Sequence, residues 1–206
     1  MLDDVPGALW QRGVIEAART SALPQLVRVV VAIDPAATSN PEADETGIIV
    51  AGRDAARNGF VLADVSGHYA PAEWAGVAIA AYRSHEADRI VAEINNGGEM
   101  VEATLRMVGP NVPFGAVRAS RGKVARAEPV AALYEQGRIR HLGAFPQLED
   151  QMCAFTNDFD RAAAGYSPDR VDALVWALTD LLVEPHAGEA MFETYRRLAA
   201  KEDEAP

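Results

Sequence analysis

The hydrophobic pattern of the chain changes near residue 70. Before that point, short β-branched and apolar runs alternate with polar turns, which predicts strands over 28–33, 47–52 and 59–65. The turn-rich segment 53–58 separates the second and third runs, so we expect them to form a hairpin that pairs with the first. From Pro71 onward, apolar residues recur at helical spacing, which predicts a helix of about four turns.

After this helix, strands and helices alternate. In chain order, the pattern predicts strand 89–94, helix 98–108, strand 112–119, helix 127–136, edge strand 138–142, and a helix that begins at Ser167-Pro168 and ends by Pro185. We predict three segments in the chain. Residues 1–25 form an N-terminal helix or linker, residues 26–185 form the folded domain, and residues 186–206 form a C-terminal helix and tail.

The order of these elements predicts the fold class. Three strands form a meander, and the later strands are connected through helices. This order is expected of an α/β fold with a mixed five-stranded sheet, three antiparallel strands then parallel ones, and helices on both faces. It is the layout of the ribonuclease H-like fold.

Composition narrows the class of protein. The chain has 206 residues, of which 49% are hydrophobic and 24% charged, values that are typical of one soluble globular domain. Its one cysteine, Cys153, excludes an internal disulfide and a zinc site built from several thiolates. No run of about eighteen apolar residues is present, so we expect no membrane segment.

The charge is unevenly distributed. A net charge of −11 argues by itself against nucleic-acid binding. Six basic residues nevertheless lie between positions 118 and 141, against two acidic ones, which gives this stretch a charge of +4 and leaves −15 for the rest. The basic residues are Arg118, Arg121, Lys123, Arg126, Arg138 and Arg140. The first four suit contacts with phosphates, although a solvated loop and helix start explains them equally well.

Carboxylates occur at positions where they can converge. Asp34 ends the first predicted strand and Glu93 lies near the end of the first crossover strand, and we expect these two strands to be neighbours. Asp169 and Asp172 are three residues apart, so they share one face of the last strong helix. Each acid alone is also explained as a turn former or a helix-start residue. Together, embedded in apolar runs, they favour a hard cation such as Mg²⁺ or Mn²⁺.

Four segments of the sequence, taken in order, resemble a known family. They are VVVAIDPAATSNPEADETGIIVAGRD, RIVAEINNGGEMV, VRASRGKVARAEPVAALYEQGRIRHLG and YSPDRVDALVWALTDL. They are similar to the nuclease domain of bacteriophage large terminase subunits, the packaging motors that cut concatemeric DNA. The similarity extends from about residue 29 to residue 182.

The resemblance implies a ribonuclease H-like endonuclease that cuts double-stranded DNA during genome packaging. It further implies two Mg²⁺ or Mn²⁺ ions held by Asp34, Glu93, Asp169 and Asp172, and phosphate contacts from Arg118, Arg121, Lys123 and Arg126. Relatives often carry adjacent aspartates before the arginine, where this chain has Pro168-Asp169. Both Asp169 and Asp172 therefore remain candidates for the main ligand.

The same resemblance implies several partners. Large terminases carry a packaging ATPase with a GxxxxGK[ST] phosphate loop, a motif that this sequence lacks. We therefore expect a separate ATPase domain, together with double-stranded DNA, the portal and the small terminase subunit, in the host cytoplasm at the procapsid. Two alternatives are a nuclease similar to Holliday-junction resolvases and a non-catalytic docking module of a packaging motor.

Overall fold

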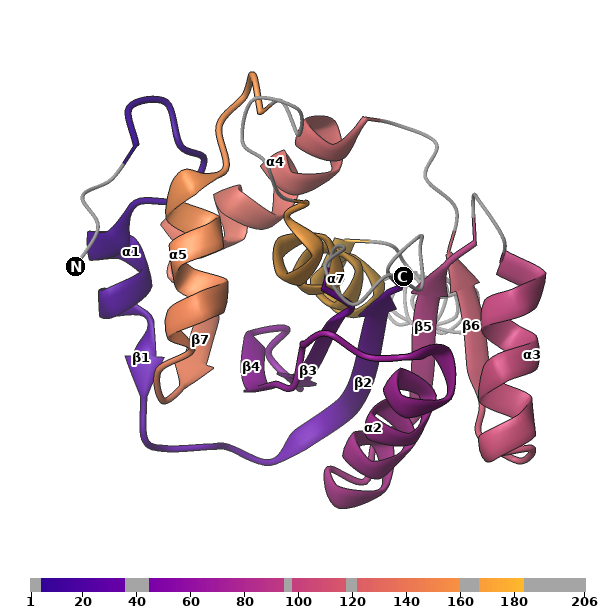
Figure 1. Ribbon diagram of the computed structural model, residues 1–206. Helices are drawn as coiled ribbons and strands as arrows, with labels where there is room; N and C mark the ends of the chain where they lie inside the picture. Colours follow the sequence, from indigo (N-terminus) through magenta and orange to yellow (C-terminus); the bar gives the residue numbers. More distant parts are fainter. Residues whose placement is uncertain (1–4, 36–44, 95–97, 118–121, 160–166, 184–206) are drawn as a thin grey trace, which may run out of the picture.

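Seven strands form one mixed sheet in the part of the chain that the computed structural model describes, residues 5–35, 45–94, 98–117, 122–159 and 167–183 (Figure 1). The strands lie in the order β1-β7-β4-β3-β2-β5-β6. Their bounds are β1 (Arg19–Thr20), β2 (Leu26–Asp34), β3 (Gly47–Asp54), β4 (Gly59–Asp64), β5 (Arg89–Glu93), β6 (Phe114–Val117) and β7 (Ile139–Leu142).

Helices cover both faces of this sheet. Their bounds are α1 (Arg12–Ala17), α2 (Pro71–Ser84), α3 (Gly98–Val108), α4 (Lys123–Glu135), α5 (Pro146–Ala154) and α7 (Asp169–Leu178), which continues into the π-helical turn η1 (Thr179–Val183). Helices α2 and α3 pack on one face, and α1, α4, α5 and α7 pack on the other. None of the helices in the described ranges has both the length and the apolar character needed to cross a bilayer.

Strand β2 lies at the centre of the sheet. It pairs antiparallel with β3 and parallel with β5, which confirms that the strands carrying Asp34 and Glu93 are neighbours. Its β-branched residues are buried on both faces, as expected for a strand between two layers of helices. The carboxyl ends of β2 and β5 therefore lie side by side at the same end of the sheet.

The predicted number of strands is wrong, because the sheet has seven strands rather than five. The sequence pattern predicts an edge strand at β7, yet β7 lies between β4 and β1 and pairs parallel with both. Strand β1 has two residues, too few to produce a periodic pattern. Helix α4 also begins at Lys123 instead of residue 127, with Pro129 in its interior. The preference of proline for the first turn of a helix made the predicted start too late.

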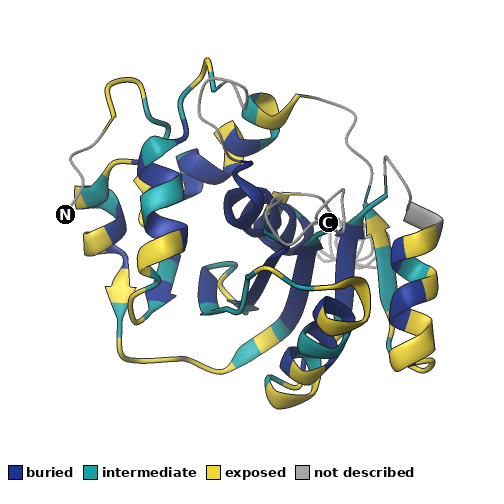
Figure 2. Cartoon of the chain, in the orientation of Figure 1, coloured by how far each residue is buried: buried dark blue, intermediate teal, exposed yellow. Residues whose placement is uncertain are grey.

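Helix α7 is buried on all sides. All ten of its residues are buried, since the helix lies between the sheet and the layer formed by α4 and α5 (Figures 1 and 2). Its apolar residues supply much of the larger hydrophobic core. Asp169, Arg170 and Asp172 nevertheless lie in its first turns. Charged groups in such a position require partners, because burying an unpaired charge is costly.

A separate buried polar network connects the N-terminal segment to the sheet. The Tyr134 hydroxyl lies 2.7 Å from Nε2 of His141, and Nδ1 of His141 lies 3.1 Å from Glu149. Because a carboxylate only accepts hydrogen bonds, Nδ1 of His141 is the donor to Glu149. Arg19 on β1 donates two hydrogen bonds to the same carboxylate. The network thus joins β1, β7, α4 and α5.

This network predicts a pH-dependent contribution to stability. Burial alone would raise the pKa of Glu149, but hydrogen bonds from His141, Arg19 and the Phe145 N–H outweigh it and lower the pKa to about 2. We expect Glu149→Gln to lower the free energy of unfolding by about 3 kcal/mol at pH 7. Because the folded pKa is depressed, the difference from wild type is present above about pH 4.5 and shrinks as the pH falls towards 2.

Urea unfolding at pH 7 and at pH 3 measures this difference. Glu128→Gln, which alters an exposed carboxylate of α4, is the matched control and should change stability little at either pH. A Glu149→Gln deficit of equal size at both pH values would contradict the assignment.

Candidate metal centre

Three of the four predicted metal ligands meet at one end of the sheet. Asp34 is the last residue of β2, and Asp169 and Asp172 lie in the first turn of α7. One carboxylate oxygen from each of the three lies within 4.8 Å of the other two. The acids predicted at the end of β2 and on one face of α7 therefore lie close together in the structure.

A glycine allows α7 to approach the sheet this closely. Gly47 begins β3 directly opposite Asp34. A Cβ atom at Gly47 would lie 1.9 Å from the Asp169 carbonyl oxygen and 2.5 Å from the carbonyl carbon. No side chain fits in that space, so a residue without a side chain is required where the helix backbone lies against the strand.

The three carboxylates repel one another. Burial is the largest cause that raises the pKa of Asp34 well above its usual value, and the charges of Asp172, Asp169 and Glu93 raise it further. Burial also raises the pKa of Asp172, despite the opposing effects of Lys123 and Arg126. Ionised carboxylates in this geometry are unfavourable without a compensating cation.

The fourth predicted ligand, Glu93, lies beside this cluster rather than within it. It is the last residue of β5, next to the end of β2. Its Oε2 accepts a hydrogen bond from Trp176 Nε1 at 3.1 Å and one from Arg126 Nη1 at 3.2 Å. Its charge still raises the pKa of Asp34 and of Asp172, which places it within electrostatic range of the cluster.

Two of the residues predicted to contact DNA face these acids. Lys123 forms an ion pair and hydrogen bond with Asp172. Arg126 bonds to Glu93, and its Nη2 lies 3.8 Å from Asp172 Oδ1. Arg126 is nearly buried, with 11% of its side chain exposed. The other two predicted contacts, Arg118 and Arg121, lie outside the described residues.

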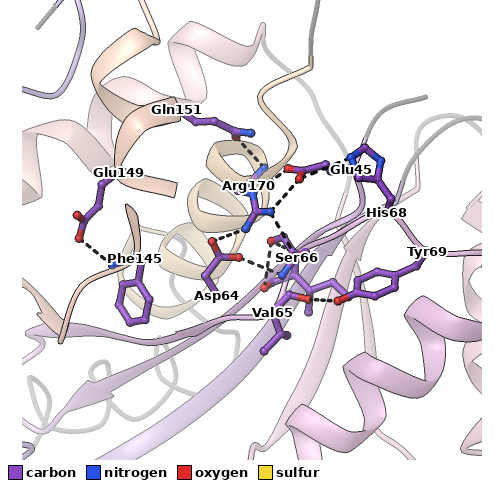
Figure 3. Close-up of polar contacts among 11 residues, drawn as sticks. Glu45, Asp64, Val65, Ser66, His68, Tyr69, Phe145, Glu149, Gln151 and Arg170 are labelled. Atoms are coloured by element: carbon purple, nitrogen blue, oxygen red, sulfur yellow. Dashed lines mark hydrogen bonds and ion pairs between the residues drawn. The ribbon is translucent and has the colours of Figure 1, made fainter. Parts of the chain in front are cut away.

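A buried arginine fixes the first turn of α7 to the sheet (Figure 3). Arg170 forms a two-point ion pair with Glu45, at 2.8 and 2.9 Å, and donates a hydrogen bond to Asp64 at 2.7 Å. Its backbone N–H donates to Gln151 of α5. Hydrogen bonding from Arg170 is the largest cause that lowers the pKa of Glu45. The residue between the two α7 aspartates thus connects β4, α5 and the segment before β3.

Sequence reasoning missed Arg170 and Gly47. The signal for Arg170 is a basic residue between two acids, Asp169 and Asp172, at the start of an otherwise apolar helix. The sequence pattern predicts a solvated loop residue or an auxiliary ligand at Glu45, whereas it is the ion-pair partner of Arg170. The role of Gly47 depends on contacts between β3 and α7, which are far apart in the sequence.

The donor set fits a hard divalent cation. All three clustered side chains offer carboxylate oxygens, which Mg²⁺ and Mn²⁺ prefer. The cluster lies at the carboxyl end of β2, where ligands bind in open α/β sheets. A cation would also relieve the repulsion that raises the pKa of Asp34.

Comparison with protein families gives the context of this site. The model of the terminase RNase H-like domain family matches residues 31–181, which include all four predicted ligands. The chain belongs to this family. A search of curated proteins gave no match. The mixed sheet with helices on both faces matches the fold of a terminase RNase H-like domain.

Several solved structures are similar to this fold. The nuclease domain of the large terminase subunit gp2 of bacterial virus Sf6 is 14% identical, with a TM-score of 0.66 over 83% of this chain and 98% of that one. The large terminase nuclease from thermophilic phage G20c with bound magnesium is 14% identical, with a TM-score of 0.57 over 85% and 98% of the two chains. The yeast mitochondrial Holliday junction resolvase Ydc2 is 12% identical, with a TM-score of 0.50 over 92% and 90%.

Proposed function

We propose that this terminase domain is a metal-dependent endonuclease that cuts double-stranded DNA during phage genome packaging. The observation that carries the proposal is the cluster of Asp34, Asp169 and Asp172 within 4.8 Å at the end of the central strand. Membership of the terminase family supports the packaging role. The magnesium bound to the phage G20c nuclease supports the kind of cofactor.

In the proposed mechanism, the carboxylates at the end of the sheet would hold the metal ions. Asp34 would hold them from β2, Asp169 and Asp172 from α7, and Glu93 from β5. When bound, two Mg²⁺ or Mn²⁺ ions activate a water and stabilise the leaving 3′ oxygen of the phosphodiester. Because the activated water is the attacking group, this mechanism requires no covalent nucleophile from the protein.

Basic residues of α4 also have a role in the proposed function, which is to contact DNA phosphates. Lys123 and Arg126 form ion pairs with Asp172 and Glu93 beside the cluster. From there they would also attract a DNA phosphate that approaches it. With Arg118 and Arg121 they would contact phosphates without reading the base sequence. Such contacts suit a nuclease that cuts DNA of any sequence.

The proposed partners follow from the family. We infer that a packaging ATPase domain presents double-stranded DNA to this domain, and that the portal and the small terminase subunit belong to the same assembly in the host cytoplasm. The strongly acidic surface, with a net charge of −11, would weaken the binding of free DNA and leave its delivery to the motor.

Cleavage of supercoiled plasmid by the purified chain tests the proposal. We expect nicked and linear products with Mg²⁺ or Mn²⁺, and none with EDTA. Cleavage that persists in EDTA would contradict the metal mechanism. If the chain neither cuts DNA nor binds Mn²⁺, the docking-module alternative is favoured instead.

A resolvase-like activity is the second candidate, because the fold is shared with the yeast mitochondrial resolvase. Linear duplexes and four-way junctions of equal length separate the two functions. A terminase nuclease should cut both substrates at similar rates, whereas a resolvase should cut the junction much faster.

A further inference from the structure

Trp176 lies on the same face of α7 as two of the clustered acids. It follows Asp172 by four residues and Asp169 by seven, a spacing that aligns side chains along one side of a helix. It is buried, and its indole N–H points at Glu93, with 3.1 Å between Nε1 and Oε2. The helix that carries two proposed ligands therefore also holds a third from the neighbouring strand.

The Trp176 ring holds a second charged group. The Arg126 guanidinium lies over the ring face, 4.4 Å from its centroid, and donates to the same Glu93 oxygen at 3.2 Å. The edge of the ring thus contacts the acid while its face contacts the cation, an arrangement favoured by the electron distribution of indole. One side chain sets the relative positions of Glu93 and its counter-ion.

Burial alone does not account for this contact. Buried indole N–H groups usually find an acceptor. Trp10 is also buried, yet its Nε1 has no hydrogen-bond partner in the described part of the chain. The fold therefore tolerates a buried indole without an acceptor, and the pairing of Trp176 with a carboxylate at the metal centre calls for another explanation.

We propose that Trp176 is a positioning residue that holds Glu93 for metal binding, an inference that rests on the proposed function. The indole N–H restricts the rotamer of Glu93, and the ring face keeps Arg126 in place beside it. Groups that bond to a metal ligand in this way commonly change metal affinity about 10- to 100-fold when they are removed.

Isothermal titration calorimetry with Mn²⁺ tests the proposal on the wild-type chain and on Trp176→Phe. Phenylalanine keeps an aromatic ring beneath Arg126 and removes the N–H. We expect Mn²⁺ to bind this variant about tenfold more weakly. Trp10→Phe is the matched control, because it removes a buried N–H that bonds to no carboxylate, and its Mn²⁺ affinity should equal that of wild type.

A second pair of variants, made in the Glu93→Gln protein, distinguishes a positioning role of Trp176 from a general disruption of the site. In Glu93→Gln, adding Trp176→Phe should cause no further loss of Mn²⁺ affinity if Trp176 acts through Glu93. Equal losses in both backgrounds would overturn the proposal, and so would unchanged affinity in Trp176→Phe alone. A wild-type chain that binds no Mn²⁺ would instead contradict the proposed function itself.

NMR of the wild-type chain keeps the proposal testable if Trp176→Phe does not fold. The chain has three tryptophans, and Trp10→Phe and Trp74→Phe assign two of the three indole N–H signals. The remaining signal belongs to Trp176. We expect Mg²⁺ to shift that signal while the other two stay in place. A Trp176 signal that does not respond to saturating Mg²⁺ would overturn the proposal.

Discussion

Asp34→Asn should abolish cleavage and, in EDTA, stabilise the protein. Asparagine has nearly the same shape as aspartate but loses the charge that is proposed to hold the cations. We expect plasmid cleavage to fall by at least about 10³-fold, a loss of about 4 kcal/mol of transition-state stabilisation. The gain in stability is expected because the Asp34 carboxylate is half-buried beside two other acids, with Asp169 and Asp172 within 4.8 Å.

The size of the stability gain follows from this repulsion. At such a distance, two like charges repel each other by about 3 kcal/mol at an effective dielectric constant of about 20. The positive charge of Lys123 offsets part of this repulsion. We therefore expect a gain of about 1–2 kcal/mol at pH 7 in EDTA, which corresponds to a rise in Tm of at least about 2 °C.

The gain should depend on pH. Because the pKa of Asp34 is raised in the folded state, the wild-type protein loses stability as the pH rises above the unfolded pKa of 3.8. The advantage of Asp34→Asn should therefore disappear at acidic pH, where Asp34 is protonated in both states. With Mg²⁺ the order reverses, because only the wild type gains binding energy.

Thermal unfolding with EDTA and with Mg²⁺, together with plasmid cleavage, measures all of these effects. Asp158→Asn is the matched control, since Asp158 is exposed and lies outside the cluster. That variant should leave both activity and Tm unchanged. An Asp34→Asn protein that retains cleavage would refute the role of Asp34. An Asp34→Asn protein that is less stable than wild type in EDTA would refute the proposed repulsion among the three carboxylates.

Local sequence patterns predicted the parts of the site that depend on local structure. Asp34 was located because an acid at the end of a β-branched strand is conspicuous, and the spacing of Asp169 and Asp172 placed both on one helix face. The pairing of β2 with β5 followed from the order of the elements. Glu93 was located in the same way, near the end of the first crossover strand, although the structure ties its carboxylate to Trp176 and Arg126.

The contacts that depend on distant segments were not predicted. Arg170 bonds to Glu45 across 125 positions of the chain, and β1 joins the sheet through two residues that pair with β7. No periodic pattern encodes such pairings, because they depend on how finished elements pack. The same reason explains why the hydrogen bond between Arg126 and Glu93 was not predicted, although Arg126 was singled out as part of a basic stretch.

Gly47→Ala should damage the metal centre without changing any charged group. The added Cβ would lie 1.9 Å from the Asp169 carbonyl oxygen, a backbone atom that cannot move by rotating a side chain. The start of α7 must therefore shift away from β3 and carry Asp169 and Asp172 away from Asp34. Overpacking of this kind costs about 1–3 kcal/mol. We expect a lower Tm and a loss of cleavage of at least about 10²-fold, since small displacements of catalytic groups have such effects.

Gly76→Ala is the control for this substitution. Gly76 lies within α2, on the opposite face of the sheet, and no atom lies within 4 Å of the position of its added Cβ. Because alanine favours a helix more than glycine does, Gly76→Ala should raise stability by up to about 1 kcal/mol and leave cleavage unchanged. Mn²⁺ titration of both variants at a temperature where each is folded separates site geometry from stability. A folded Gly47→Ala protein that binds Mn²⁺ as tightly as wild type would show that the close approach of α7 to β3 does not position the acids.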